Sequence, residues 1–101
     1  MAKVSGKQLS EAMASVPRWQ RKGQVIRRTY EFKDLPAAIK FVNAVARAAE
    51  KAWHHPDIDI RSNKVTLALT THDEGGLTGK DFSLATKSDA LAITAGVKRK
   101  A

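Results

Sequence analysis

The sequence predicts an α+β domain: a four-stranded antiparallel sheet with helices packed on one face, in the order α-β-β-α-β-β-α. Two observations indicate this class. Residues 20–32 and 58–69 each alternate apolar and polar positions around a short turn, which is typical of a β-hairpin. Three other stretches carry apolar residues three and four positions apart, which is typical of an amphipathic helix. Hairpins separated by helices favour an antiparallel sheet with its helices on one face.

The N-terminal third is predicted to form a short helix and then the first hairpin. Leu9 and Met13, four residues apart, indicate an amphipathic helix over about residues 5–14, and a following proline ends it. Gly23 is expected in the hairpin turn, because such turns often need a positive φ. Alternate residues of the second strand are expected to face the core: Ile26, Tyr30 and Phe32. Arg28 has the same parity, and the sequence gives no reason for a charge there.

The middle helix has the strongest pattern. Asp34 is the expected N-cap, and Pro36 lies in the first turn, where its missing N–H costs nothing. Apolar residues then recur at alternating steps of four and three: Leu35, Ile39, Val42, Ala46, Ala49 and Trp53. Further apolar residues widen this stripe. We therefore expect a helix to about Trp53 that covers the sheet and leaves a flank for another subunit.

The second hairpin is predicted to have a two-residue loop at Asn63-Lys64. In that register Ile60 faces Leu67 and Ile58 faces Leu69, so apolar side chains meet across the strands. A longer loop would shift the pairing by two residues and keep the faces matched.

The last helix is expected to follow the Gly75-Gly76 turn. Thr78 and Asp81 are spaced as a capping box, with the shorter carboxylate in place of glutamate. Apolar residues continue from Phe82 to a helix end near Gly96, which a basic tail follows.

Size and composition indicate one soluble, cytoplasmic domain over residues 1–101. The chain is 43% hydrophobic and 28% charged, as in globular rather than disordered proteins. No apolar run approaches the roughly 20 residues that a membrane span needs, and the first residues do not resemble a signal peptide. Because the sequence contains no cysteine, a disulfide framework, a thiolate nucleophile and a cysteine zinc site are excluded.

The formal net charge of +8 raises the possibility of a nucleic-acid partner. The lysines and arginines are spread along the chain, however, and no predicted helix carries a continuous basic stripe. The charge therefore favours a solvated surface over nucleic-acid binding.

All three histidines lie in two short segments, residues 50–57 and 70–73. Histidine has an ordinary pKa of about 6.5 and exchanges protons near neutrality. Glu50 and His54 share a helix face, so they are expected to touch. The second hairpin folds one segment back onto the other, and we expect the three imidazoles to line one small cavity. A histidine that follows a helix is often only a C-terminal cap, and the spacing does not favour a metal site.

Four motifs together carry a resemblance to a known family: Glu50-x-x-x-His54-His55-Pro56-Asp57, Val65-Thr66-Leu67, Thr71-His72-Asp73 and Gly75-Gly76-Leu77-Thr78-x-x-Asp81. They resemble the pterin-4a-carbinolamine dehydratases. Trp19 matches a tryptophan of that family, so the resemblance spans most of the chain. Ser62 departs from the pattern, since members usually carry an aromatic residue beside the turn asparagine.

The resemblance implies a hydro-lyase that removes water from 4a-hydroxytetrahydropterin, such as 4a-hydroxytetrahydrobiopterin, to give the quinonoid dihydropterin, with no metal or organic cofactor. By motif, His54 and His72 are the expected proton-transfer pair, and His55 anchors the ring. The implied substrate-binding residues are Glu50, Trp53, Thr70, Thr71, Asp73 and Trp19. Asp81 is expected first as a helix cap and second as an electrostatic influence.

The alternative reading is a binding module that uses the same fold, because relatives of this family are implicated as coactivators or assembly factors. Such a module would use the outer face of the middle helix. The alanines of that helix also favour a homodimer or homotetramer. Retention of all three histidines favours the enzyme.

Overall fold

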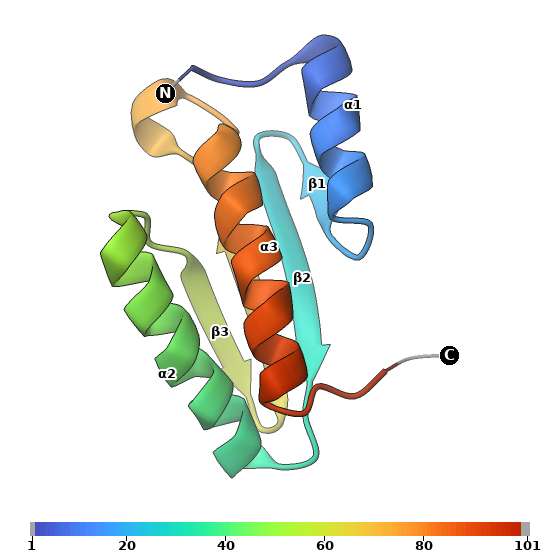
Figure 1. Cartoon of the computed structure of the whole chain (residues 1–101), viewed down its shortest axis with the longest axis vertical. Coiled ribbons are helices and arrows are strands. Elements are labelled where there is room, and N and C mark those ends of the chain that lie inside the picture. Colours follow the sequence, from blue (N-terminus) through green and yellow to red (C-terminus); the bar gives the residue numbers. More distant parts are fainter. Residues whose placement is uncertain (1, 100–101) are drawn as a thin grey trace.

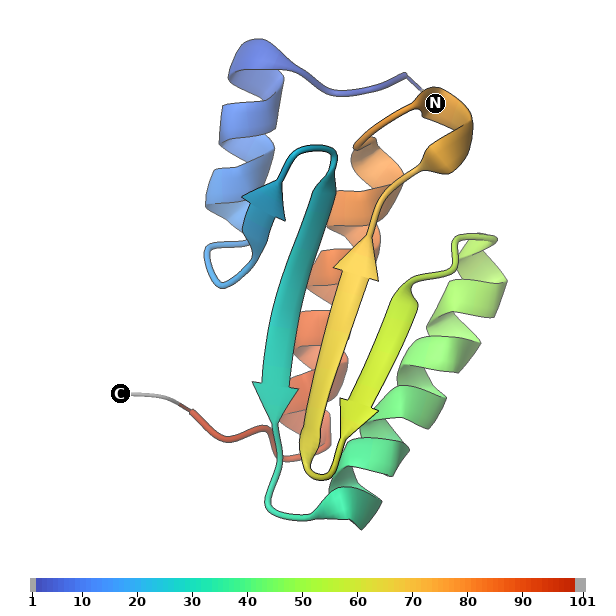
Figure 2. The same cartoon turned by 180° about the vertical axis from the view of Figure 1, so that it is seen from behind.

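The computed structural model describes residues 2–99, and it confirms the predicted α+β fold with a four-stranded antiparallel sheet. The sheet order is β1-β2-β4-β3. Helices α2 and α3 lie on one face of the sheet (Figure 1), and the other face is open when the molecule is seen from behind (Figure 2). The elements in chain order are α1 (Gly6–Ser15), β1 (Gln20–Lys22), β2 (Val25–Glu31), α2 (Leu35–Ala52), β3 (Asp57–Arg61), β4 (Lys64–Leu69), the 3-10 helix η1 (His72–Glu74) and α3 (Gly79–Thr94).

The core lies between the sheet and the two large helices. Strand β2 contributes Ile26 and Tyr30, as its parity predicted, and β4 contributes Val65, Leu67 and Leu69. Phe41 of α2 lies against Tyr30, with the ring centroids 4.7 Å apart. These apolar side chains form one continuous buried cluster, which fixes the positions of α2 and α3 over the sheet.

The buried face of α2 differs from the apolar stripe that the sequence predicted as its centre. Its fully buried residues are Ala38, Phe41, Val45 and Ala49. Leu35 is 47% exposed and Ile39 is 36% exposed, although both belonged to the predicted central stripe. The apolar surface of α2 is wider than one contact with a sheet can cover, so one flank packs and the other remains accessible.

The second hairpin has a different register from the predicted one. Arg61 pairs with Lys64, so the two loop residues are Ser62 and Asn63. The pairing is shifted by two: Ile58 faces Leu67 and Ile60 faces Val65, and apolar residues still meet. Ser62 takes a left-handed conformation with φ of 55°. The side chain of Asn63 donates to the carbonyl of Phe32 at 2.6 Å, which ties the loop to the end of β2.

The predicted helix starts are confirmed. Asp34 caps α2 by accepting a hydrogen bond from the Ala37 amide at 2.9 Å. Thr78 and Asp81 form a capping box at the start of α3. Gly23 occupies the first hairpin turn with φ of 60°. Within residues 2–99, no helix is both long and apolar enough to cross a membrane.

Candidate active site

His54 is the buried member of the histidine group. The chain leaves α2 through Trp53, whose left-handed backbone (φ 53°, ψ 39°) turns His54 inward under the last helical turn. The His54 amide donates to the carbonyl of Ala49 at 3.1 Å, and the whole residue is only 8% exposed. Its Nε2 lies 2.5 Å from Oδ1 of Asp81 in the first turn of α3. A long-range contact between the segment that follows α2 and the first turn of α3 therefore fixes this imidazole.

Asp81 is fully buried and forms a hydrogen bond at each of its oxygens. Oδ1 faces His54, while Oδ2 accepts from the Thr71 hydroxyl at 2.8 Å and from the Thr78 amide at 2.9 Å. The first turn of a helix favours a negative charge, because its free amides and the helix dipole point toward it. The carboxylate that caps α3 is thus also the group that orients His54.

Thr71 connects this carboxylate to the segment that carries His72. The Thr71 amide donates to the carbonyl of Gly76 at 3.1 Å, and the Gly76 amide donates back to Thr71 at 3.2 Å. This isolated bridge closes a small loop that contains η1, with Gly75 in a left-handed conformation. His72 is the first residue of η1 and is exposed directly beside Thr71. The loop therefore brings the second histidine segment to the Asp81 end of the site.

His55 lies at the surface, and it rather than His54 pairs with Glu50. Their contact joins His55 Nε2 to Glu50 Oε2, and both side chains are largely exposed. The predicted contact between Glu50 and His54 was wrong, because α2 ends at Ala52 and the left-handed residue Trp53 rotates His54 away from the Glu50 face. The next residue, His55, then comes within reach of Glu50.

Trp53 is 84% exposed, an unusual environment for an indole. It is also one of only two non-glycine residues with positive φ in the part of the chain that the structure describes. In the left-handed region a side chain is crowded against the following carbonyl, so glycine or asparagine is usual at such a helix end. A large exposed aromatic side chain therefore stands beside the His54-His55 pair.

The remaining predicted site residues divide into two groups. Asp73 is exposed in η1 beside His72, and Thr70 uses its hydroxyl to donate to the carbonyl of Gln24 at 2.6 Å. Trp19 is not with the histidines: it is buried, and its Nε1 donates to Asp89 at 3.0 Å. Asp89 is eight residues beyond Asp81 on α3, about 12 Å along the helix axis.

The sequence placed Thr78 and Asp81 in the capping box, but it did not predict the contact of Asp81 with His54 or that of Thr78 with Thr71. The Thr78 hydroxyl lies 2.9 Å from that of Thr71, and its amide donates to Asp81. The signal in the sequence was the aspartate at the third helical position, where glutamate is the usual partner in a capping box. Here one oxygen of the aspartate accepts the capping bond and the other faces His54.

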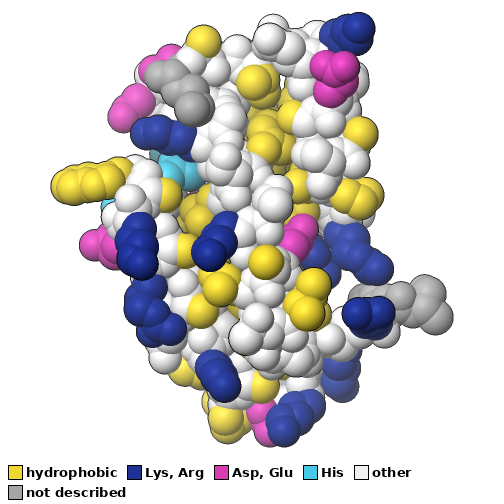
Figure 3. Space-filling model, in the orientation of Figure 1, with side chains coloured by type: hydrophobic (Ala, Val, Ile, Leu, Met, Phe, Trp, Pro, Cys, Tyr) yellow, Lys and Arg dark blue, Asp and Glu magenta, His cyan; other side chains and the backbone are white. Residues whose placement is uncertain are grey.

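The arrangement is suited to proton transfer. With Nε2 of His54 held by a carboxylate, Nδ1 is the nitrogen left to exchange a proton. Histidine reaches the helix-covered surface only in a small area at one margin, among scattered Lys and Arg side chains (Figure 3). In the described part of the chain, no group of three or more His, Asp or Glu side chains is placed to hold a metal ion.

Comparison with known proteins identifies the family to which the chain belongs. Residues 2–91 match the family model of pterin 4 alpha carbinolamine dehydratase. The chain belongs to the pterin-4a-carbinolamine dehydratase family. It is 53% identical over 91 residues to a protein of Acidobacterium capsulatum named "Putative pterin-4-alpha-carbinolamine dehydratase", covering 90% of this chain and 99% of the relative. A relative of the same name from a Roseiflexus species is 52% identical over 89 residues, covering 88% and 96% of the two chains.

Two solved structures of pterin dehydratase-like proteins share the fold. One is a transcriptional coactivator/pterin dehydratase from Brucella melitensis, with a TM-score of 0.86 and 34% identity over 89% of this chain and 98% of that one. The other is a pterin dehydratase-like protein identified as a RuBisCO assembly factor in the alpha-carboxysome, with a TM-score of 0.63 and 25% identity. It is matched over 74% of this chain and 87% of its own. The pterin dehydratase fold is thus found in proteins with different described roles.

Proposed function

We propose that this chain is a cytoplasmic hydro-lyase that dehydrates 4a-hydroxytetrahydropterin to the quinonoid dihydropterin, as part of tetrahydropterin recycling. The observation that carries the proposal is the buried His54-Asp81 pair, in a chain that belongs to the dehydratase family. Loss of water from this substrate requires two proton transfers and no redox step. Side chains whose pKa lies near the working pH perform such transfers best.

The reaction breaks the C4a–O bond, removes the proton from N5 and forms the N5–C4a double bond. Asp81 accepts from Nε2 of His54, so the neutral imidazole carries its proton there and presents a lone pair at Nδ1. We assign to His54 the uptake of the N5 proton. His72, on the loop held by Thr71, is assigned the protonation of the leaving hydroxyl, which departs as water.

The other residues bind and orient the ring. His55, held by Glu50, is assigned to anchor the pterin, and the exposed face of Trp53 offers a surface on which a flat bicyclic ring stacks. Asp73 is assigned to the amino edge of the ring. Because the hydroxyls of Thr70 and Thr71 are already engaged, we give these residues a supporting role.

The test is the rate of quinonoid dihydropterin formation with each histidine replaced in turn. His54→Ala and His72→Ala are expected to lower kcat by about 10²–10⁴-fold, the usual contribution of positioned proton transfer. His55→Ala is expected to raise KM more than it lowers kcat. Normal turnover by both the His54→Ala and the His72→Ala proteins would show that the site assignment is wrong.

A second function, as a binding module, is favoured by an apolar surface. Leu35 and Ile39 of α2 and Ile58 and Ile60 of the edge strand β3 are all at least 36% exposed. We propose that this flank joins copies of the chain into a homodimer or homotetramer, or takes a partner protein.

Mutations at two different places separate the two functions: Ala46 lies on α2, and His54 lies after the end of that helix. Ala46→Glu on the exposed side of α2 is expected to weaken assembly and leave dehydration intact, and His54→Ala is expected to do the reverse. Sedimentation measures the assembly, and the rate of quinonoid dihydropterin formation measures the chemistry. Loss of dehydration in an Ala46→Glu protein that still assembles would count against this separation.

A further inference from the structure

A recess lies at the opposite edge of the sheet from β3. Strand β1 pairs with β2 only over Val25 to Arg27, and beyond it the Lys98 amide donates to the carbonyl of Glu31 at 2.7 Å. Amide groups along a strand point alternately to its two sides, so the amide and carbonyl of Thr29 face the same edge as the Glu31 carbonyl. Within residues 2–99 no strand covers Thr29 on that side.

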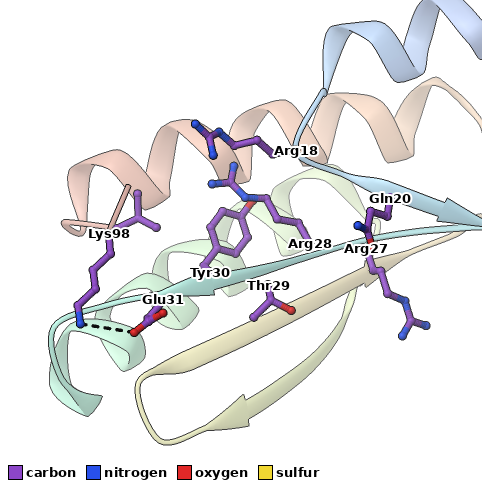
Figure 4. Close-up of a pocket in the computed structure, with 9 residues that line it drawn as sticks. Arg18, Gln20, Arg27, Arg28, Thr29, Tyr30, Glu31 and Lys98 are labelled. Carbon is purple, nitrogen blue, oxygen red and sulfur yellow. Dashed lines mark hydrogen bonds and ion pairs between the residues drawn. The ribbon is translucent and has the colours of Figure 1, made fainter. Parts of the chain in front are cut away.

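A groove with two lobes occupies this gap. One lobe, of about 380 Å³, runs along the edge of β2 (Figure 4), and the other, of about 280 Å³, extends toward α3. Both lobes are lined by Arg18, Arg28, Val97 and Lys98. Each volume lies near the lower end of the range found for small-molecule sites. We call this recess the β2-edge groove.

The β2-edge groove carries an excess of positive charge. Its cationic side chains are Arg18, Arg27, Arg28, Lys98 and Arg99. Its two carboxylates are already paired, Asp89 with Arg28 at 2.7 Å and Glu31 with Lys98 at 3.4 Å. No carboxylate of residues 2–99 forms an ion pair with Arg18 or Arg27. With these carboxylates paired, the groove keeps a surplus of positive charge, which favours an anion.

Arg28 is held in one orientation before any ligand arrives. Oδ1 of Asp89 accepts hydrogen bonds from Arg28, from the Tyr30 hydroxyl at 2.5 Å and from Trp19. The Arg28 guanidinium also lies over the Tyr30 ring, 4.2 Å from its centroid, where a cation–π interaction stabilises it. Burial, and then the bond to Asp89, raise the pKa of Tyr30 well above its ordinary value, so the hydroxyl remains a neutral donor.

The arginines reach the groove from two different segments. In Figure 4 the guanidinium groups of Arg18, which precedes β1, and Arg28, on β2, extend to the same side, toward α3, while Arg27 points to the other face of the sheet. A planar guanidinium binds phosphate through two parallel N–H donors, and two guanidinium groups in one recess match a dianion. Val97 and the exposed Ile93 add an apolar wall.

We propose that the β2-edge groove binds a small phosphate monoester. Its phosphate lies between Arg18 and Arg28, near the Thr29 amide and Lys98, and its organic part lies against Val97 and Ile93. A recess closed at one end by β1 and at the other by the Val97-Lys98 segment suits a small molecule better than a polynucleotide. The site shares no residue with the histidine site.

The test uses phenyl phosphate and the two tryptophans as reporters. The chain has two indole N–H groups: Trp19, bonded to Asp89 beside the groove, and Trp53, at the histidine site. In ¹⁵N-resolved NMR titrations, phenyl phosphate is expected to shift the Trp19 indole and the Thr29 amide in a saturable manner and to leave Trp53 unmoved. Potassium chloride at equal ionic strength controls for screening.

Arg18→Ala is expected to weaken phenyl phosphate binding by about tenfold, the effect of losing one charge-assisted contact. Arg47→Ala, an exposed arginine on α2 outside the groove, is the matched control and is expected to bind normally. Inorganic phosphate is expected to bind more weakly than phenyl phosphate. Shifts confined to Trp53, no saturable shift at all, or equal affinity in the Arg18→Ala and wild-type proteins would overturn the proposal.

Discussion

The replacement Asp81→Asn exchanges one oxygen of the buried carboxylate for an NH₂ group. It tests whether Asp81 sets the orientation and tautomer of His54 in the proposed site. Oδ2 of Asp81 accepts two donors, the Thr71 hydroxyl and the Thr78 amide, and Oδ1 faces His54. An asparagine best keeps its carbonyl oxygen toward the two donors, because both remain satisfied that way. Its NH₂ group then points at Nε2 of His54, which must now accept.

That reversal moves the imidazole proton from Nε2 to Nδ1. The lone pair proposed to take the N5 proton is lost while the ring stays in place, so kcat is expected to fall by about 10²–10⁴-fold with KM little changed. Replacing charge-assisted hydrogen bonds by neutral ones is expected to lower the free energy of unfolding by about 1–3 kcal/mol. Rapid-mixing measurement of quinonoid dihydropterin formation gives kcat, and urea unfolding gives the stability.

The matched control is Asp59→Asn on the exposed edge strand β3, where Asp59 forms an exposed ion pair with Arg61 at 3.2 Å. It removes the same charge and is expected to change neither quantity appreciably. The pH dependence of kcat separates orientation of the imidazole from simple destabilisation, because only a changed imidazole alters the profile. A folded Asp81→Asn protein with wild-type kcat and an unchanged pH profile would refute the assignment of Asp81.

Three further results are expected. Trp53→Asn should raise the free energy of unfolding by about 1 kcal/mol, because asparagine adopts the left-handed conformation with less strain. The same change should raise KM for the pterin, and an unchanged KM would show that Trp53 does not bind it. Tyr30 is the only tyrosine in the sequence, and its pKa is raised in the folded protein, so tyrosinate absorbance should stay absent above pH 10 until the chain unfolds. The free energy of unfolding should fall as the pH rises past 10, because only the unfolded chain then releases the proton. Tyrosinate absorbance near pH 10 in folded protein would contradict this. Phe41→Ala should lower the free energy of unfolding by about 3–5 kcal/mol in urea titrations, because Phe41 is fully buried against Tyr30 and Phe32; a loss below 1 kcal/mol would show that the core refills the space.

Local chemistry explains which parts of the fold the sequence predicts well. Asp34, Gly23 and the Thr78-Asp81 pair act within a few residues of themselves, and each lies where the pattern placed it. The predicted register of the second hairpin was wrong by two residues. The position of the loop involves the hydrogen bond from the Asn63 side chain to the carbonyl of Phe32, and these two residues are 31 positions apart in the sequence. Periodicity identifies the two faces of a strand, but it does not distinguish registers that differ by two.

The candidate site shows the same division. Grouping of the histidine segments follows from the hairpin, whereas the partner of His54 depends on how α2 and α3 meet. Helical spacing favoured Glu50, and one left-handed residue, Trp53, redirected that contact to His55. Arg28 was unexplained for a similar reason, since its partner Asp89 is 61 positions away on α3.

The two oxygens of the Asp81 carboxylate divide between the fold and the proposed site. Loss of the His54 imidazole would leave Oδ1 of a fully buried carboxylate without its partner, whereas Oδ2 would still accept the capping bond of α3 and the bond from Thr71. An aspartate at position 81 is therefore explained by the start of α3 alone, and it does not by itself indicate an enzyme. Under the proposed function, the three histidines are the positions that would distinguish an enzyme from a binding module.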